Sequence, residues 1–341
     1  MTDGEIRTGR DAEQAVIPGT PGDGRVLEGT PSEIEAVQPE LAELVIPSFE
    51  AAGIAVGAVP QWRTVWRRYR RHKLAMISLA LLLIIGVACL LAPWIAPKEF
   101  REQDTANLLA RPGEAGFSLG SDSLGRDQLT RLLYGGRISL LVGVSVALVS
   151  GVVGTFVGAV TGYFGGRLDT FLMRLTDLFL SIPFLVFLIM MSRLLGGSVV
   201  DIVLILSMIT WMPLARIVRG LFLSLKEKEF VDAARSIGAS SRRIILRHIL
   251  PNCLGPIIVN LTLAVAAAIL TESALSFLGY GVQPPTPTWG NMLSDSRSFT
   301  RIAPWLVWFP GLAILLTVLT VNYIGDGLRD AFDPTQRRVR R

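Results

Sequence analysis

The sequence has few of the residues from which catalytic, metal and disulfide sites are usually built. Its 341 residues include two cysteines and two histidines, too few for a disulfide framework or a self-contained Cys/His metal cluster. Cys89 and Cys253 both lie in apolar runs, so buried free thiols are expected. The sequence also lacks the GxxxxGK(S/T), HExxH and CxxC patterns of phosphate loops, zinc proteases and redox sites. We therefore expect no enzyme activity, cofactor or metal.

Charged residues are scarce as well, at 18% of the chain, whereas soluble domains usually have about 25%. Half of the residues are hydrophobic and the mean hydropathy is +0.48, which suits a chain surrounded largely by lipid. The net charge of +5 is uneven, because residues 1–60 hold eleven acids and three bases and the remainder carries +13. The bases flank apolar runs, a pattern of membrane topology that makes a nucleic-acid partner unexpected.

The first 73 residues divide into two segments of different character. Residues 1–60 are rich in Gly, Pro and Glu, which predicts a disordered acidic cytoplasmic tail, and they lack the basic and apolar regions of a signal peptide. In residues 61–73, basic side chains surround an apolar stripe formed by Trp62, Val65, Trp66 and Tyr69. This spacing predicts an amphipathic helix in the membrane interface, and a simple lipid anchor is favoured over a specific lipid site.

Six apolar runs follow, with lengths near the ~20 residues needed to cross a bilayer. The predicted fold class is therefore an all-α membrane protein with six transmembrane helices. Twenty Lys and Arg lie on one side of these runs and nine on the other, which favours both termini in the cytoplasm. The runs are 74–92, 138–160, 171–191, 199–215, 249–271 and 302–325; they define a first transmembrane helix over 74–96, an extracytoplasmic loop over 97–137, a five-helix core over 138–327 and a basic cytoplasmic tail over 328–341.

Small residues, prolines and acids inside the runs suggest how the helices pack. Small residues recur four apart in the second run, which lets helix backbones approach closely, either within the chain or at a subunit interface. Prolines should bend their helices. The few acids lie near the ends of the runs, without the central series typical of proton-coupled carriers. The residues are Ser150, Gly154, Gly158 and Gly162 in one row, Ser139, Gly143, Ala147 and Gly151 in the other, Pro183, Pro213 and Pro310, and Asp177, Asp201 and Glu272.

The long loop over 223–252 is the most informative segment. It predicts two short cytoplasmic helices with a break at Gly238. In the first, Phe230, Ala233, Ala234 and Ile237 share one face, and the two alanines form a flat surface that another protein can approach. In the second, three isoleucines are expected toward the membrane, three arginines at its surface, and a proline at the start of the fifth span; these are Ile244, Ile245 and Ile249, Arg242, Arg243 and Arg247, and Pro251.

This loop resembles the EAA loop of type I ABC importer permeases. That pattern runs Glu-Ala-Ala, three residues, Gly, nine residues, Ile, one residue, Leu-Pro. Asp232, Ala233, Ala234 and Gly238 keep the spacing of its first half, and Leu250-Pro251 keeps that of its end. Asp in place of Glu preserves the charge on a shorter arm, and His248 stands where the pattern has Ile.

Other segments resemble the dipeptide and oligopeptide permeases among these importers, with a likeness that runs from about residue 61 to 334 and leaves the acidic tail outside. It is closest to the C-type of the two permease subunits in peptide and nickel importers. The segments are LGSDSLGRD over 119–127, RLLYGGRIS over 131–139, ESALSFLGYGVQPP over 272–285 with Trp289-Gly290, and GDGLRDAFDP over 325–334.

The resemblance implies a transport subunit in a bacterial cytoplasmic membrane. Its partners would be a homologous second permease subunit, two ABC ATPase subunits, an extracytoplasmic binding protein, membrane lipid and a peptide substrate, with ATP used only by the ATPases. The coupling loop would contain Asp232 as a polar contact, Ala233 and Ala234 as close-packing residues and Gly238 as the turn, together with Leu250 and Pro251.

Other positions support less specific interpretations. Asp122 and Arg126 either cap local helices or dock the binding protein, and Trp289 follows a proline-rich turn that either is ordinary loop structure or lies under that protein. Glu272, near the outer end of its span, is a candidate for the substrate path or its gate. The alternatives are an importer of nickel, glutathione or another small solute on the same frame and, from a different class, a self-sufficient secondary carrier with its own ion site.

Overall fold

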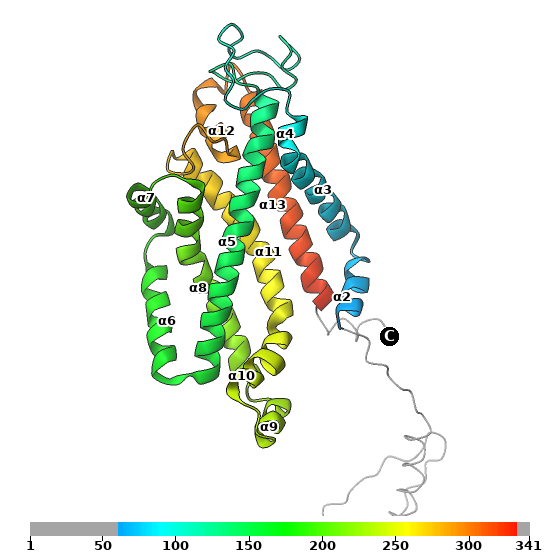
Figure 1. The fold of residues 1–341 in the computed structure, drawn as a ribbon, viewed down its shortest axis with the longest axis vertical. Helices are drawn as coiled ribbons and strands as arrows, with labels where there is room; N and C mark the ends of the chain where they lie inside the picture. The colour runs from blue at the N-terminus through cyan, green and yellow to red at the C-terminus, as the bar shows by residue number, and fades with distance from the viewer. Residues whose placement is uncertain (1–60, 333–341) are drawn as a thin grey trace, which may run out of the picture. The chain divides into compact units, whose positions relative to one another are not determined.

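The computed structural model describes residues 61–332, so the predicted acidic tail and most of the basic tail lie outside the described residues. Within them, regular structure is helical apart from one isolated bridge between Ser121 and Asp127. The helices, drawn in Figure 1, are α2 (Gln61–Tyr69), α3 (Lys73–Leu90), α4 (Ala92–Ile95), α5 (Gln128–Phe164), α6 (Gly166–Ser181), α7 (Phe184–Leu195), α8 (Val199–Leu225), α9 (Glu229–Ser236), α10 (Ser241–Arg243), η1 (Ile244–Ile249), α11 (Leu250–Phe277), α12 (Trp289–Asp295), η2 (Arg297–Phe299) and α13 (Trp305–Phe332).

The apolar helices confirm the predicted membrane class. Five continuous helices in the described residues are long and apolar enough to cross a bilayer: α3, α5, α8, the unit formed by α10, η1 and α11, and α13. The expected span over 171–191 is not one straight helix, because it is divided between α6 and α7, which are bent by 91° relative to each other. Pro183 lies at this break as the N-cap of α7, and a proline disfavours helical backbone in the residue before it.

The central helix, α5, packs directly against α8 and α11 through its two rows of small residues. A methyl group on Gly154 would come within 2.7 Å of the Trp211 carbonyl oxygen in α8. A methyl group on Gly143, in the other row, would come within 2.6 Å of the Ile269 side chain in α11. Both rows therefore serve contacts within this chain, at backbone separations that any larger residue would prevent.

The amphipathic helix α2 lies against the last helix and is only partly directed at lipid. Tyr69 is 3% exposed and packs beside Gly327 and Ala75, whereas Trp66 remains 52% exposed. Figure 1 shows α2 and α3 beside α13, with α6 and α7 on the far side of α5. The predicted amphipathic helix is therefore confirmed as a helix. Of its aromatic stripe, Tyr69 packs inside the protein and Trp66 remains exposed.

We expect the close contact of α5 with α8 to be sensitive to a single methyl group. Gly154→Ala should destabilise the protein by about 1–3 kcal/mol, the usual cost of overpacking, because the carbonyl of Trp211 belongs to the backbone and cannot rotate aside. Gly220→Ala in α8 is the matched control, since its methyl group would meet no atom within 4 Å. Thermal unfolding in detergent should show a lower midpoint for Gly154→Ala only, and equal midpoints for the two variants would contradict this packing.

Candidate functional site

A short helical hairpin, formed by α9 and α10, projects at one end of the bundle (Figure 1). Gly238 lies between the two helices with φ +77°, a backbone conformation that favours glycine. The Gly238 N–H donates to the Arg235 carbonyl at 2.9 Å, and the Ala239 N–H donates to the Ala234 carbonyl at 3.0 Å. These two bonds form a Schellman motif, so the predicted break at Gly238 is a defined turn.

One face of α9 packs against η1 and belongs to a core that also includes residues of α8 and α11. Val231 is 0% exposed and Ala234 is 4% exposed, and both belong to a core that includes Phe222, Ile244 and Ile249. Two expectations are therefore corrected: Ala234 packs inward, and Ile244 and Ile249 face this core instead of the membrane. Because its anchor is a dry apolar contact, α9 is held firmly to the helices that continue into the bundle.

An adjoining face of α9 is apolar and exposed. Phe230, Ala233 and Ile237 recur at i, i+3 and i+7, and Ile237 is 84% exposed. Beside them, Asp232 and Arg235 form an exposed ion pair at 3.1 Å. An apolar stripe left in contact with water on a rigid hairpin is typical of a surface that docks another protein. The motif residues thus have separate places: Ala233 and Asp232 on the outside, Ala234 in the core and Gly238 in the turn.

The hairpin is joined to α11 without a break, and Pro251 lies in the first turn of α11, as expected for the start of the fifth span. A continuous helix runs from Ser241 to Phe277, and its section from Ile244 to Ile249 is a π-helix. The Leu250 N–H donates to the Ile245 carbonyl, five residues earlier. Pro251 has no N–H to donate to the Arg247 carbonyl and its ring would crowd that oxygen, which accounts for the wider turn before it.

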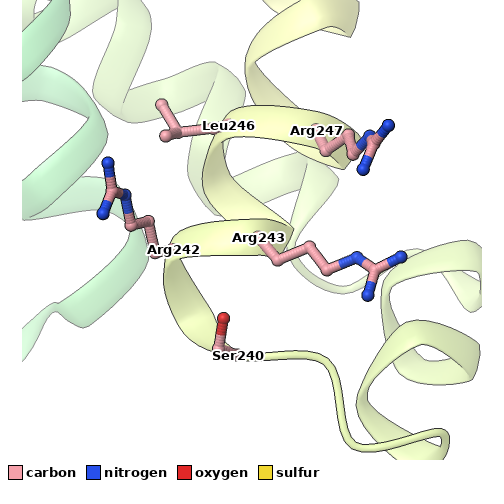
Figure 2. Close-up of a pocket in the computed structure, with 5 residues that line it drawn as sticks. All are labelled: Ser240, Arg242, Arg243, Leu246 and Arg247. Atoms are coloured by element: carbon pink, nitrogen blue, oxygen red, sulfur yellow. The ribbon is translucent and has the colours of Figure 1, made fainter.

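A basic hollow of about 300 Å³ lies at this joint and is shown in Figure 2. The guanidinium groups of Arg243 and Arg247 point to one side, while Arg242 points to the other. The described residues provide no ion pair for any of these three arginines, whereas Arg216 and Arg219 of the nearby α8 are paired with aspartates of α6. The hollow is lined by Ser240, Arg242, Arg243, Leu246 and Arg247.

At the other end of the bundle, a buried ion network ties the loop before α5 to α12. Arg126 donates to Asp122 at 2.6 Å and to Asp295 at 3.2 Å, and Arg131 donates to the same Asp295 oxygen at 3.2 Å. Asp122 is 5% exposed and Arg126 is 8% exposed. Their side chains therefore act in local structure, one of the two expected roles, and docking of a binding protein stays a prediction.

Asp104 and Asp127 organise the same loop through hydrogen bonds. Asp127 is the N-cap of α5 and accepts the Thr130 N–H at 2.7 Å. The Asn107 amide donates to Asp104 at 2.9 Å and, with backbone N–H groups, holds the pKa of Asp104 below its usual range. The loop is thus held by specific polar contacts although it contains no long helix or strand.

Trp289 and Glu272 belong to a second anchor of α12. Trp289 is 1% exposed, and its indole N–H donates to the Leu132 carbonyl at 2.9 Å, which gives this side chain a structural role; a place under the binding protein stays a prediction. Glu272 is 0% exposed and accepts from Ser276 at 2.7 Å and from Ser139 at 3.3 Å. The Ser139 hydroxyl in turn accepts a hydrogen bond from the backbone N–H of Trp289 at 3.3 Å. Glu272 is therefore enclosed by protein in this conformation and does not line an open path.

Sequence reasoning missed that α12 is held at both ends. Its first residue is connected to Glu272 through Ser139, and its last, Asp295, is connected to two arginines. The sequence signal was weak, because Asp295 lies more than 160 positions from its partners. Only the folded arrangement brings these groups together.

We expect Asp295→Asn to lower the free energy of unfolding, because it removes the carboxylate that Arg126 and Arg131 share, and both arginines are buried. Asp295 is partly exposed, so the expected cost is about 1–3 kcal/mol, below that of a fully buried pair. Asp232→Asn removes a carboxylate from the exposed pair with Arg235 and should cost less than about 1 kcal/mol. Chemical unfolding in detergent measures both, and a loss for Asp295→Asn no larger than that for Asp232→Asn would contradict the structural role of the network.

Comparisons with known proteins agree on one family. Residues 154–338 match the binding-protein-dependent transport system inner membrane component, and residues 60–112 match the N-terminal TM domain of oligopeptide transport permease C. The chain is 44% identical over 277 residues to the oligopeptide transport system permease protein OppC of Escherichia coli (strain K12), covering 81% of this chain and 92% of that protein.

Two further relatives extend this similarity to other named solutes. The dipeptide transport system permease protein DppC of Alkalihalophilus pseudofirmus is 40% identical over 280 residues, covering 82% of this chain and 92% of that protein. The glutathione transport system permease protein GsiD of Shigella flexneri serotype 5b is 43% identical over 274 residues, covering 80% of this chain and 90% of that protein. The similarity thus includes almost the whole length of each relative and most of the described chain.

Proposed function

The chain belongs to the family of binding-protein-dependent transport system inner membrane components, and we propose that it is the C-type permease subunit of an ATP-driven importer of dipeptides or oligopeptides. The observation that carries the proposal is the hairpin of α9 and α10, whose exposed Phe230, Ala233 and Ile237 lie on a helix anchored in the bundle core. The oligopeptide and dipeptide permeases among the relatives support the substrate class.

We further propose an orientation with α9 in the cytoplasm. The segments at that end carry most of the Lys and Arg outside the apolar runs, including the three arginines of the basic hollow, which have no ion pair among residues 61–332. The loop before α5 and α12 would then face the extracytoplasmic side. There, the exposed surface of this loop, held by the Asp122, Arg126 and Asp295 network, would receive a binding protein.

In the proposed mechanism, this chain moves in response to partner ATPases and carries out no bond chemistry itself. Two ATPase subunits would dock at the exposed stripe of α9 and at its counterpart on a homologous second permease subunit. Because Val231 and Ala234 pack against Phe222 and Ile249, displacement of α9 is passed to both α8 and α11. Tilting of these helices would expose a central path between the two permeases alternately to each side.

The glutathione permease relative favours one second candidate substrate, glutathione, which is itself a small peptide. A self-sufficient secondary carrier is not proposed, since the family is described by its dependence on a binding protein. Purified complex with each candidate binding protein, assayed for ATP-driven uptake of dipeptides, longer peptides and glutathione, distinguishes the substrates.

We expect Gly238→Val to uncouple ATP hydrolysis from transport while the chain still inserts. A β-branched residue at φ +77° strains the Schellman turn by about 1–2 kcal/mol or more, so Ile237 and the exposed stripe of α9 should shift. Gly279→Val is the matched control, because Gly279 also has a positive φ, +86°, and open space around it, and ends α11 at the other end of the bundle in a turn with the same two hydrogen bonds.

The measurement is peptide uptake per ATP hydrolysed by the assembled complex in vesicles. Gly238→Val should reduce this ratio several-fold, and Gly279→Val should leave it unchanged. Copurification of the ATPase subunits reports whether assembly is intact. Unchanged uptake per ATP in the Gly238→Val complex would show that the hairpin does not couple the two processes.

A further inference from the structure

An apolar groove of about 580 Å³ lies between α5 and α11, beside the basic hollow. Its volume is within the roughly 300–1,000 Å³ typical of small-molecule sites. Aliphatic and aromatic side chains form its walls, among them Val152 and Phe156 of α5 and Leu254 and Leu261 of α11. Arg242 is the one charged residue among those that line it.

The groove has about the length of one membrane leaflet. Along α11 its lining runs from Leu250 to Leu261, which corresponds to ~16 Å of helix, and along α5 from Leu148 to Phe164, or ~24 Å. One leaflet contributes ~15 Å of hydrocarbon and, with its headgroups, ~20 Å or slightly more. The lining begins at the α9 end of the bundle and reaches about to the middle of the spans.

The groove and the basic hollow are neighbours that share Arg242 and Leu246. Figure 2 shows both side chains on the same side of the helical turn, while Arg243 and Arg247 lie on the other. Three arginines lie within six residues, and the described residues provide none of them with an ion pair. An anion bound beside Arg242 would supply a partner, and guanidinium groups suit phosphate oxygens in particular.

We propose that this combined surface binds an anionic phospholipid of the cytoplasmic leaflet. An acyl chain would lie in the groove between α5 and α11. The phosphate would bind Arg242 and the Ser240 hydroxyl, with Arg243 and Arg247 adding to the attraction. A free phosphate would leave the apolar groove unfilled, and an apolar protein helix would leave the arginines unpaired, whereas a lipid satisfies both parts. Basic pockets at the cytoplasmic ends of membrane helices are suited to anionic lipid headgroups.

The site lies at the joint between α9 and the spans, since Arg242, Arg243 and Arg247 belong to α10 and η1. This part of the inference rests on the proposed function: bound lipid would stiffen the joint and so increase uptake per ATP hydrolysed. Lipid binding itself depends only on the proposed orientation and is measured separately from transport.

The test is retention of phosphatidylglycerol by the purified complex, measured by native mass spectrometry against phosphatidylcholine. The triple variant Arg242→Gln, Arg243→Gln, Arg247→Gln should retain at least about tenfold less phosphatidylglycerol, since each basic residue near an anionic surface contributes ~1 kcal/mol. The matched control is Arg67→Gln, Arg70→Gln, Arg71→Gln, which removes the same charge from exposed positions in and after α2. Equal losses in the two triple variants would show general attraction and overturn the site.

A second pair of variants tests the groove without changing charge. Val152 is 72% exposed and lines the groove, so Val152→Trp should fill it and displace the lipid. Val144, 46% exposed on the same helix but outside the groove, is the control position for the same change. Retention that survives Val152→Trp would overturn the proposal. So would cross-linking of a cysteine at position 152 to the second permease, because that subunit would then occupy the groove.

Transport in vesicles separates this inference from the proposed function. Adding phosphatidylglycerol to phosphatidylcholine vesicles should raise peptide uptake per ATP several-fold for the wild-type complex, and not for the triple variant of the hollow. If lipid is retained selectively but no peptide is imported under any condition, the proposed function fails and the lipid site stands. If peptide is imported with no dependence on lipid and no selective retention, the lipid site fails alone.

Discussion

The near-contact of backbones along α5 is the constraint on which the rest of the structure depends. At Gly143 and Gly154 there is no space for even a methyl group between α5 and its neighbours. Lipid offers little hydrophobic drive for helix association, so close van der Waals contact has to provide much of the stability. Both α8 and α11 pack closely against α5 in this way. The segments at their ends, which include α9 and α12, are therefore held on one rigid unit.

The two ends of the bundle use that support differently. At the α9 end, the contact is apolar: Val231 and Ala234 enter a dry core with Phe222, and the exposed face remains available to a partner. At the α12 end, the contacts are polar: Glu272 reaches α12 through Ser139, and Asp295 bridges Arg126 and Arg131. Buried polar contacts depend strongly on geometry, so they fix the position of α12. The apolar contacts hold α9 firmly and leave one of its faces exposed.

The π-helical joint links these features to function. A wide turn before Pro251 places the arginines of the basic hollow between the hairpin and the spans, where force from an ATPase would have to pass. The same few residues thus serve the attachment of α9 and the proposed contact with lipid. In the proposed function, the membrane surface and the docked ATPase would meet at this one place on the chain.

Much of the fold, and the position of the loop motif, can be predicted from the sequence because they depend on residues close together in the chain. Long apolar runs predict spanning helices, Gly238 permits the positive φ of a turn, and Pro183 disfavours helix at the break between α6 and α7. The Asp-Ala-Ala pattern likewise identified the hairpin before its position was known. Each of these inferences needs only neighbouring residues and the chemistry of the solvent.

The tertiary structure alone decided which surfaces are covered. Ala233 and Ala234 are adjacent and chemically identical, yet one faces out and the other is buried, because only the packing of α8 and α11 distinguishes them. Trp289 and Arg126 read as surface residues but are enclosed by segments far away in the chain. The apolar groove also arises from helices nearly a hundred residues apart. Burial is a property of the partners a residue meets, and one sequence does not reveal those partners until the chain has folded.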